Sequence, residues 1–481
     1  MEENLNSKVR TATKWSTITE IAAKLVTPIT SMVLARLLTP EAFGVVTTLT
    51  MIITFAELFT DAGFQKYLIQ HEFRDEEDRE QSTTVAFWSN LVMSLFLWGI
   101  IAIFADPLAT MVGNPGLGHV LIVACVSIPL AAFSSIQMAL YKRDFDFKTL
   151  FKVRMVAVVI PLVVTIPLAF WLRSYWALII GTITVNLVNA ILLTVFSKWK
   201  PRLYYSFAKL KEMLSFTIWT MIEQVSIWLT GYVDVFIVGT MLSQYYLGLY
   251  KTSSTLVGQI MGIVVAITTP VLFSGLSRLQ NDEKEFQQLF FRFQKMVGIL
   301  VIPLGVGMYI FSDFFTELLL GDQWLEASGF IGLWGLTNGI VIVLGHYSSE
   351  VYRAKGLPKL SVLSQILHLL FLVPTILIAV GYGFETLYIS RSLVRLTGVI
   401  INLVLMGCFI KMPVGKMITN VLPSCLAASF MFLIRILPEA NGMAMSLVYV
   451  LIASAIYCLA IMVFPNERNI ILNFPKFIKE K

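Results

Sequence analysis

The chain has 481 residues, of which 57% are hydrophobic and only 14% are charged, and its mean hydropathy is +0.77. Soluble domains carry about a quarter charged residues, so this composition excludes an ordinary soluble domain. The formal net charge of +6 is compatible with nucleic-acid binding, but the basic residues lie where membrane topology requires them, so no nucleic-acid partner is expected.

Apolar stretches of about 20 residues, the length at which a helix crosses a bilayer, recur along almost the whole chain. Because backbone polar groups in lipid must be satisfied within the element, such continuous stretches are helices and not barrel strands. We therefore predict an all-α integral membrane protein with about 14 transmembrane helices. The expected spans are 15–35, 42–64, 82–104, 117–140, 153–172, 175–196, 213–239, 248–273, 297–311, 330–349, 361–380, 386–410, 417–437 and 443–464.

Basic residues are concentrated in alternate loops between the expected spans. Of the 36 Lys and Arg residues, 29 lie in the two termini and every second loop, whereas the opposite loops contain only Arg36 and Arg173. The segment from Lys142 to Arg154 contributes five of them and is expected to be a cytoplasmic loop. Because cytoplasmic loops are enriched in Lys and Arg, this pattern predicts an even number of spans with both termini in the cytoplasm.

The cysteines and the N-terminus indicate neither a disulfide framework nor secretion. All four cysteines lie in apolar stretches without the spacing of metal ligands, so we expect packing residues and no disulfide, metal or other cofactor. Residues 1–14 are polar and lack a small-residue cleavage site, so no removable signal peptide is expected. The cysteines are Cys125, Cys408, Cys425 and Cys458.

An internal repeat relates two segments that are 204 residues apart. Leu38 aligns with Leu242 and Gly44 with Gly248, and each short turn has a hydroxyl residue suited to capping the next helix. An even number of spans separates the copies, which predicts a parallel repeat about an axis along the membrane normal. In transporters with this symmetry, two lobes rock against each other around a central cavity. The alternative is chance similarity between apolar helices.

Three motifs carry a resemblance to a known family. They are ARLLTPEAFG at 35–44, DAGF at 61–64 followed by LIQ at 68–70, and ALYKRDF at 139–145 followed by FK at 147–148. In this order they resemble the Wzx-type flippases of lipid-linked oligosaccharides, especially the colanic-acid and teichuronic-acid exporter branch of the multidrug/oligosaccharidyl-lipid/polysaccharide superfamily. The resemblance covers the whole chain in span number and loop lengths, and its motifs lie in the first 150 residues.

The resemblance implies two six-helix lobes, residues 1–200 and 201–412, followed by two more helices and a cytoplasmic tail in 413–481. It implies a transporter, not an enzyme, in the cytoplasmic (inner) membrane of a bacterium. Its implied partner is an undecaprenyl-pyrophosphate-linked oligosaccharide, which alternating access moves across the membrane for surface polysaccharide biosynthesis. Membrane lipids and polysaccharide-assembly proteins are further expected partners, and the chain is expected to act as a monomer.

Positive charges inside the spans are candidates for binding the anionic head group. An ionisable side chain at the bilayer centre is costly and therefore marks a functional-site hypothesis. Arg391 and Arg395 lie one turn apart, and paired guanidinium groups suit a pyrophosphate or an acidic sugar. Lys24 and Lys251 add point charges. The alternative is that these charges form structural ion pairs, Glu20 with Lys24 and Asp234 with Lys251.

Energy for transport is expected from an ion gradient, because the sequence contains no Gly-rich phosphate-binding loop. A carboxylate in apolar surroundings can load and release protons, so H+ or Na+ is the expected coupling ion. The candidates are Glu57, Asp61, Glu223 and Asp234. The charged run at 72–80 is interpreted as a solvated loop. Prolines inside spans, Pro161 among them, predict helix bends.

Other functions are less compatible with the sequence. A glycan polymerase, ligase or lipid-linked glycosyltransferase requires a catalytic constellation at the outer face. The longest expected external segments, 105–116 and 312–329, contain acids but no Lys, Arg or His, so no catalytic residues are predicted. A cation-coupled multidrug extruder and a peptidoglycan lipid-precursor flippase remain alternatives within transport.

Overall fold

The computed structural model describes the backbone of residues 2–61, 63–438, 440 and 442–479. Side chains are described in these ranges except at 2–10, 12–14, 16, 17, 21, 61, 215–223, 226 and 473–479. Throughout the described part, the regular elements are all helical. The chain packs into two compact units, Met1–Lys251 (unit 1) and Thr252–Lys481 (unit 2), and each is described by itself.

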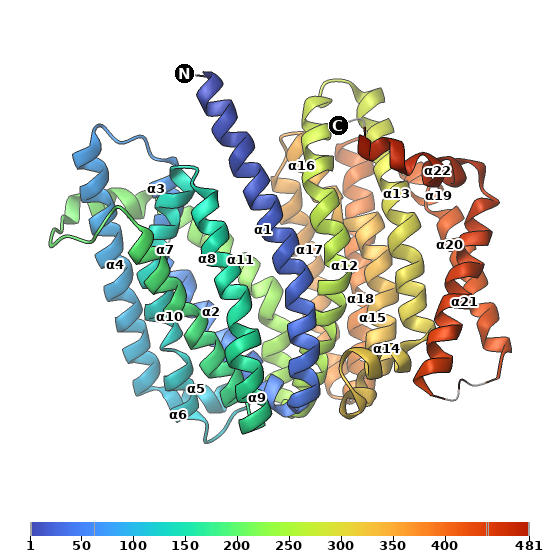
Figure 1. Ribbon diagram of the computed structural model, residues 1–481, viewed down its shortest axis with the longest axis horizontal. Helices are drawn as coiled ribbons and strands as arrows, with labels where there is room; N and C mark the ends of the chain where they lie inside the picture. Colours follow the sequence, from blue (N-terminus) through green and yellow to red (C-terminus); the bar gives the residue numbers. More distant parts are fainter. Residues whose placement is uncertain (1, 62, 439, 441, 480–481) are drawn as a thin grey trace. The chain divides into compact units, whose positions relative to one another are not determined.

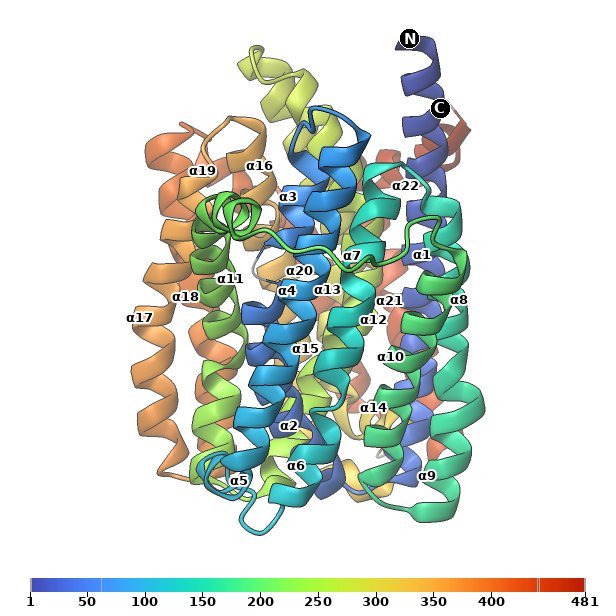
Figure 2. The ribbon, with the colours of Figure 1, turned by 90° about the vertical axis from the view of Figure 1, so that its left-hand side faces the viewer.

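Unit 1 is a bundle of long helices with short helices at its ends. The short helices α5, α6 and α9 lie at the end of the bundle opposite to α3 (Figures 1 and 2). Its elements are α1 (Glu2–Leu37), α2 (Pro40–Asp61), α3 (Phe64–Gln70), α4 (Glu76–Ile103), α5 (Ala105–Met111), α6 (Gly118–Ala124), α7 (Ser127–Arg143), α8 (Phe147–Ile160), the π-helical η1 (Pro161–Thr165), α9 (Ile166–Leu172), α10 (Trp176–Phe196), α11 (Phe207–Met241) and the start of α12 (Gln244–Arg278).

Unit 2 repeats this construction, with α14 at one end and α16, α19 and α22 at the other (Figure 1). After the remainder of α12, its elements are α13 (Glu283–Ile310), α14 (Ser312–Leu319), the 3-10 helix η2 (Asp322–Ala327), α15 (Ser328–Val341), the π-helical η3 (Ile342–His346), α16 (Ser348–Ala354), α17 (Lys359–Val380), α18 (Phe384–Phe409), α19 (Val414–Thr419), α20 (Leu422–Ser429), the 3-10 helix η4 (Phe430–Ile436), α21 (Met443–Met462) and α22 (Pro465–Lys479).

The helices have the length and composition of membrane spans, which confirms the predicted fold class. Within the described residues, 13 helical segments are long and apolar enough to cross a bilayer. A shorter apolar segment, Ile227–Met241, lies in α11 at the position of the seventh expected span. The protein is therefore an all-α, multi-pass membrane protein. The lobe boundaries at 200 and 412 and the cytoplasmic location of the termini stay predictions.

The two turns of the predicted repeat have matching boundaries and contact each other. Helix α1 ends at Leu37 and α2 begins at Pro40, while α11 ends at Met241 and α12 begins at Gln244, an offset of 204 residues at both positions. A Cβ atom on Gly44 would lie 1.9 Å from the Gln244 carbonyl oxygen, and one on Gly248 would lie 1.8 Å from that of Pro40. The contact is reciprocal, as expected where two related turns meet, and it requires glycine on both sides.

An apolar cluster in unit 1 collects buried side chains from α2, α4, α6, α7 and α10. Cys125 is part of this cluster and is fully buried, as the sequence predicted. The packing expectation is wrong for the other three cysteines, which are exposed.

The expectation of a solvated loop at 72–80 holds for residues 72–75 and is wrong for residues 76–80, which belong to α4. Asp75 caps α4 by accepting a 2.7 Å hydrogen bond from the Asp78 amide. The connection between α10 and α11 crosses this end of α4 in Figure 2. Three residues of the run also form ion pairs elsewhere in unit 1. The pairs are Asp78–Lys209, Arg79–Asp144 at 2.9 Å and Glu80–Arg202 at 2.7 Å.

Candidate functional site

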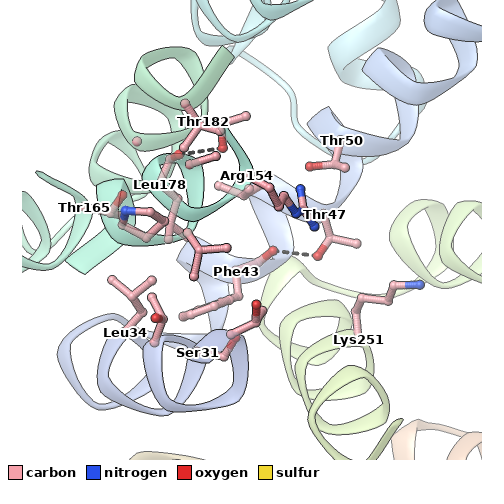
Figure 3. A pocket seen from close by; sticks show the side chains of 18 of the residues that line it. Ser31, Leu34, Phe43, Thr47, Thr50, Arg154, Thr165, Leu178, Thr182 and Lys251 are labelled. Atoms are coloured by element: carbon pink, nitrogen blue, oxygen red, sulfur yellow. Dashed lines mark hydrogen bonds between the residues drawn. The ribbon is translucent and has the colours of Figure 1, made fainter. Parts of the chain in front are cut away.

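Unit 1 contains a cavity of about 440 Å³, here called the cationic cavity, between α1, α2, η1, α10 and the ends of neighbouring helices. Arg154 of α8 and Lys251 of α12 both line it. In Figure 3 the tip of Arg154 lies beside Thr47 and Thr50 of α2, and Lys251 lies on the far side of Thr47. No carboxylate is present among the described lining residues, so the cavity favours an anion.

Arg154 reaches this cavity because α8 begins early. The helix starts at Phe147, with Asp146 capping it through a 3.1 Å hydrogen bond from the Thr149 amide. Arg154 therefore lies seven residues beyond the first helical residue, about 10 Å along the axis. Its side chain is accessible from the cavity, so the guanidinium group stays solvated.

Lys251 is positioned by an aromatic side chain of α11. Its ammonium group lies 5.3 Å from the centre of the Tyr232 ring, within the range of a cation–π interaction. Tyr232 in turn stacks on Trp228, one turn earlier in α11, with the ring centres 5.4 Å apart. The indole nitrogen of Trp228 donates to the Thr54 hydroxyl at 3.1 Å. This chain of contacts fixes the aromatic pair against α2.

Hydroxyl groups supply most of the other polar surface of the cationic cavity. The Thr47 hydroxyl donates to the Phe43 carbonyl at 2.8 Å, and that of Thr182 donates to the Leu178 carbonyl at 2.9 Å. These bonds satisfy the hydroxyl protons within the helix and leave oxygen lone pairs for water or ligand hydroxyls. The π-helical turn after Pro161 brings in Thr165, and Gly181 opposite has no side chain to block it.

A second cavity of about 620 Å³, here called the amide cavity, is also lined entirely by unit 1. Its walls come from α2, α3, α4, α7, α10 and α11. Glu57 and Lys66 bring one charge of each sign. The remaining polar lining is neutral and consists of Thr54, Thr60, Gln65, Asn90, Ser134, Ser135, Asn186, Asn189 and Gln224 beside Trp228 and Tyr232.

The two cavities adjoin along the same helices. Tyr232 lines both of them. On α2, Thr47 and Thr50 line the cationic cavity, while Thr54 and Glu57 line the amide cavity. These four residues are spaced by three or four positions and therefore share one helix face. One polar stripe thus runs along half of α2, from Thr47 to Glu57, within a bundle of membrane spans.

Residues 33–329, more than half of the chain, match the model of a family described as polysaccharide biosynthesis protein. The chain belongs to this family.

Curated relatives carry names from polysaccharide biosynthesis. The chain is 24% identical to the succinoglycan biosynthesis transport protein ExoT of Rhizobium meliloti (strain 1021), over 71% of this chain and 68% of the relative. It is 22% identical to the lipopolysaccharide biosynthesis protein WzxC of Escherichia coli (strain K12), over 78% and 76%. It is 20% identical to an uncharacterized membrane protein in the cps region of Klebsiella pneumoniae, over 96% of both chains.

Solved structures of two transporter types have the same fold as this family member. The lipid II flippase MurJ, in an inward closed conformation, superposes with a TM-score of 0.71 at 16% identity, covering 95% of this chain and 99% of the other. An inward-facing MATE multidrug transporter superposes with a TM-score of 0.60 at 14% identity, covering 82% and 96%. These similarities establish the fold that the chain shares with both structures.

Unit 2 of this family member brings together the predicted arginine pair. The guanidinium carbons of Arg391 and Arg395 lie 5.1 and 3.9 Å from the centre of the Trp334 ring. Arg395 also donates to the amide oxygen of Asn338 at 2.6 Å. The two guanidinium groups therefore share one side of α18, as their spacing predicted, and Trp334 supports both.

The remaining predicted site residues are not among the described lining residues of the two cavities. Lys24 is half-buried on α1, one turn before Thr27 of the cationic cavity. Asp234 is buried and accepts a 2.6 Å hydrogen bond from the Tyr250 hydroxyl. The side chains of the coupling candidates Asp61 and Glu223 lie outside the described residues.

The structure adds residues that the sequence analysis missed. Arg154 was counted with the basic residues of a cytoplasmic loop at the start of the expected span 153–172 and was not named as a binding candidate, but it lies on α8 and lines the cationic cavity. The neutral amides of the second cavity were not singled out, because only charged residues were considered costly inside spans. Asn186 and Asn189, which interrupt the apolar sequence of α10, were the available signal.

Proposed function

We propose that the protein is a flippase that moves an undecaprenyl-pyrophosphate-linked oligosaccharide across the cytoplasmic membrane of a bacterium for surface polysaccharide biosynthesis. The observation that carries this proposal is the cationic cavity, where Arg154 and Lys251 face one polar space inside a bundle of membrane spans. A pyrophosphate offers several anionic oxygens, and Arg binds phosphate through two parallel hydrogen bonds while Lys acts as a point charge.

The family and the fold support a transporter. The family description refers to polysaccharide biosynthesis, and ExoT is named as a transport protein. A lipid-linked glycan has to carry a large polar head group through the apolar part of the membrane. The polar stripe of α2, continuous from Thr47 to Glu57, provides a surface for such a head group.

Lys24, Arg391 and Arg395 are proposed as further contacts for the anionic head group during transport. Trp334 supports both guanidinium groups from one side, which favours their binding one phosphate together, and Arg side chains bind phosphate through paired hydrogen bonds. Lys24 shares α1 with the hydroxyl residues of the cationic cavity. Each of these roles predicts a loss of export when the charge is removed.

Coupling to H+ or Na+ is proposed at Glu57. This carboxylate lines the amide cavity, on the polar stripe of α2, and so lies where the head group would pass. Asp234, Asp61 and Glu223 remain proposed alternatives. A Glu57→Gln variant that still binds substrate but no longer responds to an imposed ion gradient would support this assignment.

The test of the proposed function is deletion of the gene in its host, with analysis of undecaprenyl-linked oligosaccharides and of surface polysaccharide. The expected result is accumulation of complete lipid-linked repeat units inside the cell and loss of surface polymer. The wild-type gene should restore export, whereas Lys251→Met and the double variant Arg391→Ala/Arg395→Ala, expressed at equal levels, should not.

Three other results would replace the proposal. Intact surface polysaccharide together with sensitivity to cationic drugs would indicate a multidrug extruder. Accumulation of peptidoglycan lipid precursors would indicate a peptidoglycan-precursor flippase. Partly polymerised or unligated glycan at the outer face would indicate a polymerase or ligase.

A further inference from the structure

Two amide side chains on α10 line the amide cavity without a hydrogen-bond partner in the described part of the protein. Asn186 and Asn189 are three residues apart, are half-buried, and both line the cavity. Among the described residues, none donates to or accepts from either amide group. An amide without a partner is costly in an apolar environment, so a membrane helix places such groups only where water or a ligand satisfies them.

A membrane-helix amide with a structural role looks different in this protein. Asn402 on α18 donates to the Gly398 carbonyl at 2.9 Å and accepts from the Tyr352 hydroxyl at 3.1 Å. Both ends of that amide are occupied by the protein itself. The amides of Asn186 and Asn189 instead keep their donors and acceptors for whatever occupies the cavity.

The opposite walls of the amide cavity offer complementary groups. Asn90 of α4 is fully buried and donates to the Ser135 hydroxyl at 2.6 Å, which fixes the orientation of that lining residue. On α11, the stacked pair Trp228 and Tyr232 presents aromatic surface to the same space. Neutral hydrogen-bonding groups combined with an aromatic platform match a sugar ring, which has hydroxyls around its edge and C–H groups on its faces.

We propose that the amide cavity is a glycan subsite that binds hydroxyl-rich sugar residues next to the pyrophosphate, with Asn186 and Asn189 as hydrogen-bonding residues and Trp228 as a stacking residue. The assignment rests on the proposed function, which places the pyrophosphate in the cationic cavity. Tyr232 borders both cavities, so the sugars nearest the pyrophosphate fall beside it. The volume of about 620 Å³ lies in the range of pockets that enclose ligands of drug size, comparable to a short oligosaccharide.

The test compares two probes on the purified full-length protein in lipid nanodiscs. One probe is undecaprenyl pyrophosphate without sugar, and the other is the repeat-unit oligosaccharide released from the host's own surface polysaccharide. The variant Asn186→Leu/Asn189→Leu replaces both amides with apolar groups of similar size. Thr184→Val is the matched control, because the Thr184 hydroxyl only donates to the Ile180 carbonyl of the same helix at 2.7 Å.

The expected result is a loss of about tenfold or more in oligosaccharide affinity for the double variant, since two hydrogen bonds to sugar hydroxyls are removed. Its affinity for undecaprenyl pyrophosphate should remain within about twofold of wild type. Lys251→Met should show the reverse pattern, and Thr184→Val should change neither affinity. The single variant Asn189→Ala, which causes a smaller loss, serves if the double variant does not fold.

Two outcomes overturn the subsite and are distinct from failure of the proposed function. A folded Asn186→Leu/Asn189→Leu protein with unchanged oligosaccharide affinity would show that the amides do not contact sugar. An equal loss of affinity for the oligosaccharide and for undecaprenyl pyrophosphate in this variant would show that the substitutions disturb both cavities and not sugar binding alone. In both cases deletion of the gene would still cause complete lipid-linked repeat units to accumulate inside the cell, whereas failure of the proposed function would mean that they do not accumulate there.

Discussion

At the residue scale, the cationic cavity depends on one charge from α8 and one from α12. Arg154 and Lys251 come from helices that are distant in sequence, and threonine hydroxyls line the same cavity (Figure 3). Because the hydroxyl groups are neutral, the positive electrostatic potential in the cavity comes mainly from Arg154 and Lys251. Arg154 is therefore the residue whose removal tests the cavity most directly.

We predict that Arg154→Gln lowers export of surface polysaccharide by about tenfold or more, because a charge-assisted hydrogen bond to the substrate is lost. The measurement is polymer at the cell surface of the deletion strain carrying the variant, normalised to protein level in the membrane. Lys152→Gln is the matched control, because Lys152 is an exposed residue of the same helix. Equal export by Arg154→Gln and wild type would exclude a role for this charge in transport.

The motif ALYKRDF at 139–145 shows how far individual residues could be interpreted from sequence. In the sequence this motif only supported the resemblance to a family. The structure shows what its charged residues contact. Arg143 donates to the carbonyls of Leu68 and His71 at 2.6 and 2.8 Å, which satisfies the carbonyl end of α3. Asp144 binds Arg79 at 2.9 Å. The motif therefore connects the end of α7 to α3 and α4 within unit 1. The sequence alone did not indicate this structural role.

At the scale of elements, close approach of helices is set by glycine. The α1–α2 and α11–α12 turns meet at Gly44 and Gly248, where any Cβ atom would collide with a carbonyl oxygen. In unit 2, a Cβ atom on Gly305 of α13 would lie 2.8 Å from the Gly335 carbonyl oxygen of α15. Small residues at such crossings are typical of helices packed in membranes, where dispersion contacts replace the hydrophobic effect.

We predict that Gly248→Ala destabilises the protein by about 1–3 kcal/mol, because the added methyl group forces the two turns apart. The measurement is the thermal unfolding midpoint of the protein purified in detergent. Gly258→Ala on the same helix is the control, since no atom lies within 4 Å of its Cβ position. That substitution should be neutral or stabilising by up to about 1 kcal/mol, as expected for alanine in a helix. Similar unfolding midpoints for Gly248→Ala and Gly258→Ala would contradict the close contact between the two turns at Gly248.

At the scale of the whole molecule, the distribution of basic residues and the order of the helices predict which turns lie inside and which lie outside the cytoplasm. The turns that carry Gly116 and Gly321 are expected outside, and those that carry Asp144 and Gly356 inside. Within unit 1, α5, α6 and α9 lie at the end opposite to α3 (Figures 1 and 2), which agrees with this alternation.

We predict that alkaline phosphatase fused after Gly116 is active, because this enzyme folds only outside the cytoplasm, whereas a fusion after Asp144 is inactive. A green fluorescent protein fused at the C-terminus should be fluorescent for the complementary reason. The measurement is enzyme activity and fluorescence of whole cells expressing each fusion at comparable levels. Reversed activities would place both termini outside the cytoplasm and would contradict the topology predicted from the basic residues.

The sequence by itself determined the class of the protein, because a bilayer imposes a length and an apolarity that are visible residue by residue. It also determined the repeat turns, whose boundaries depend on local capping and proline positions. It placed Arg391 and Arg395 on one side of a helix, because helical spacing is a local property.

Only the tertiary structure decided which side chains meet across helices. The cationic cavity joins Arg154 to Lys251, and the amide cavity joins Asn186 and Asn189 to Trp228. These neighbours come from different helices, and their rotation about the helix axis is set by packing throughout unit 1. No local pattern encodes that rotation, so the sites emerged only when the helices were assembled.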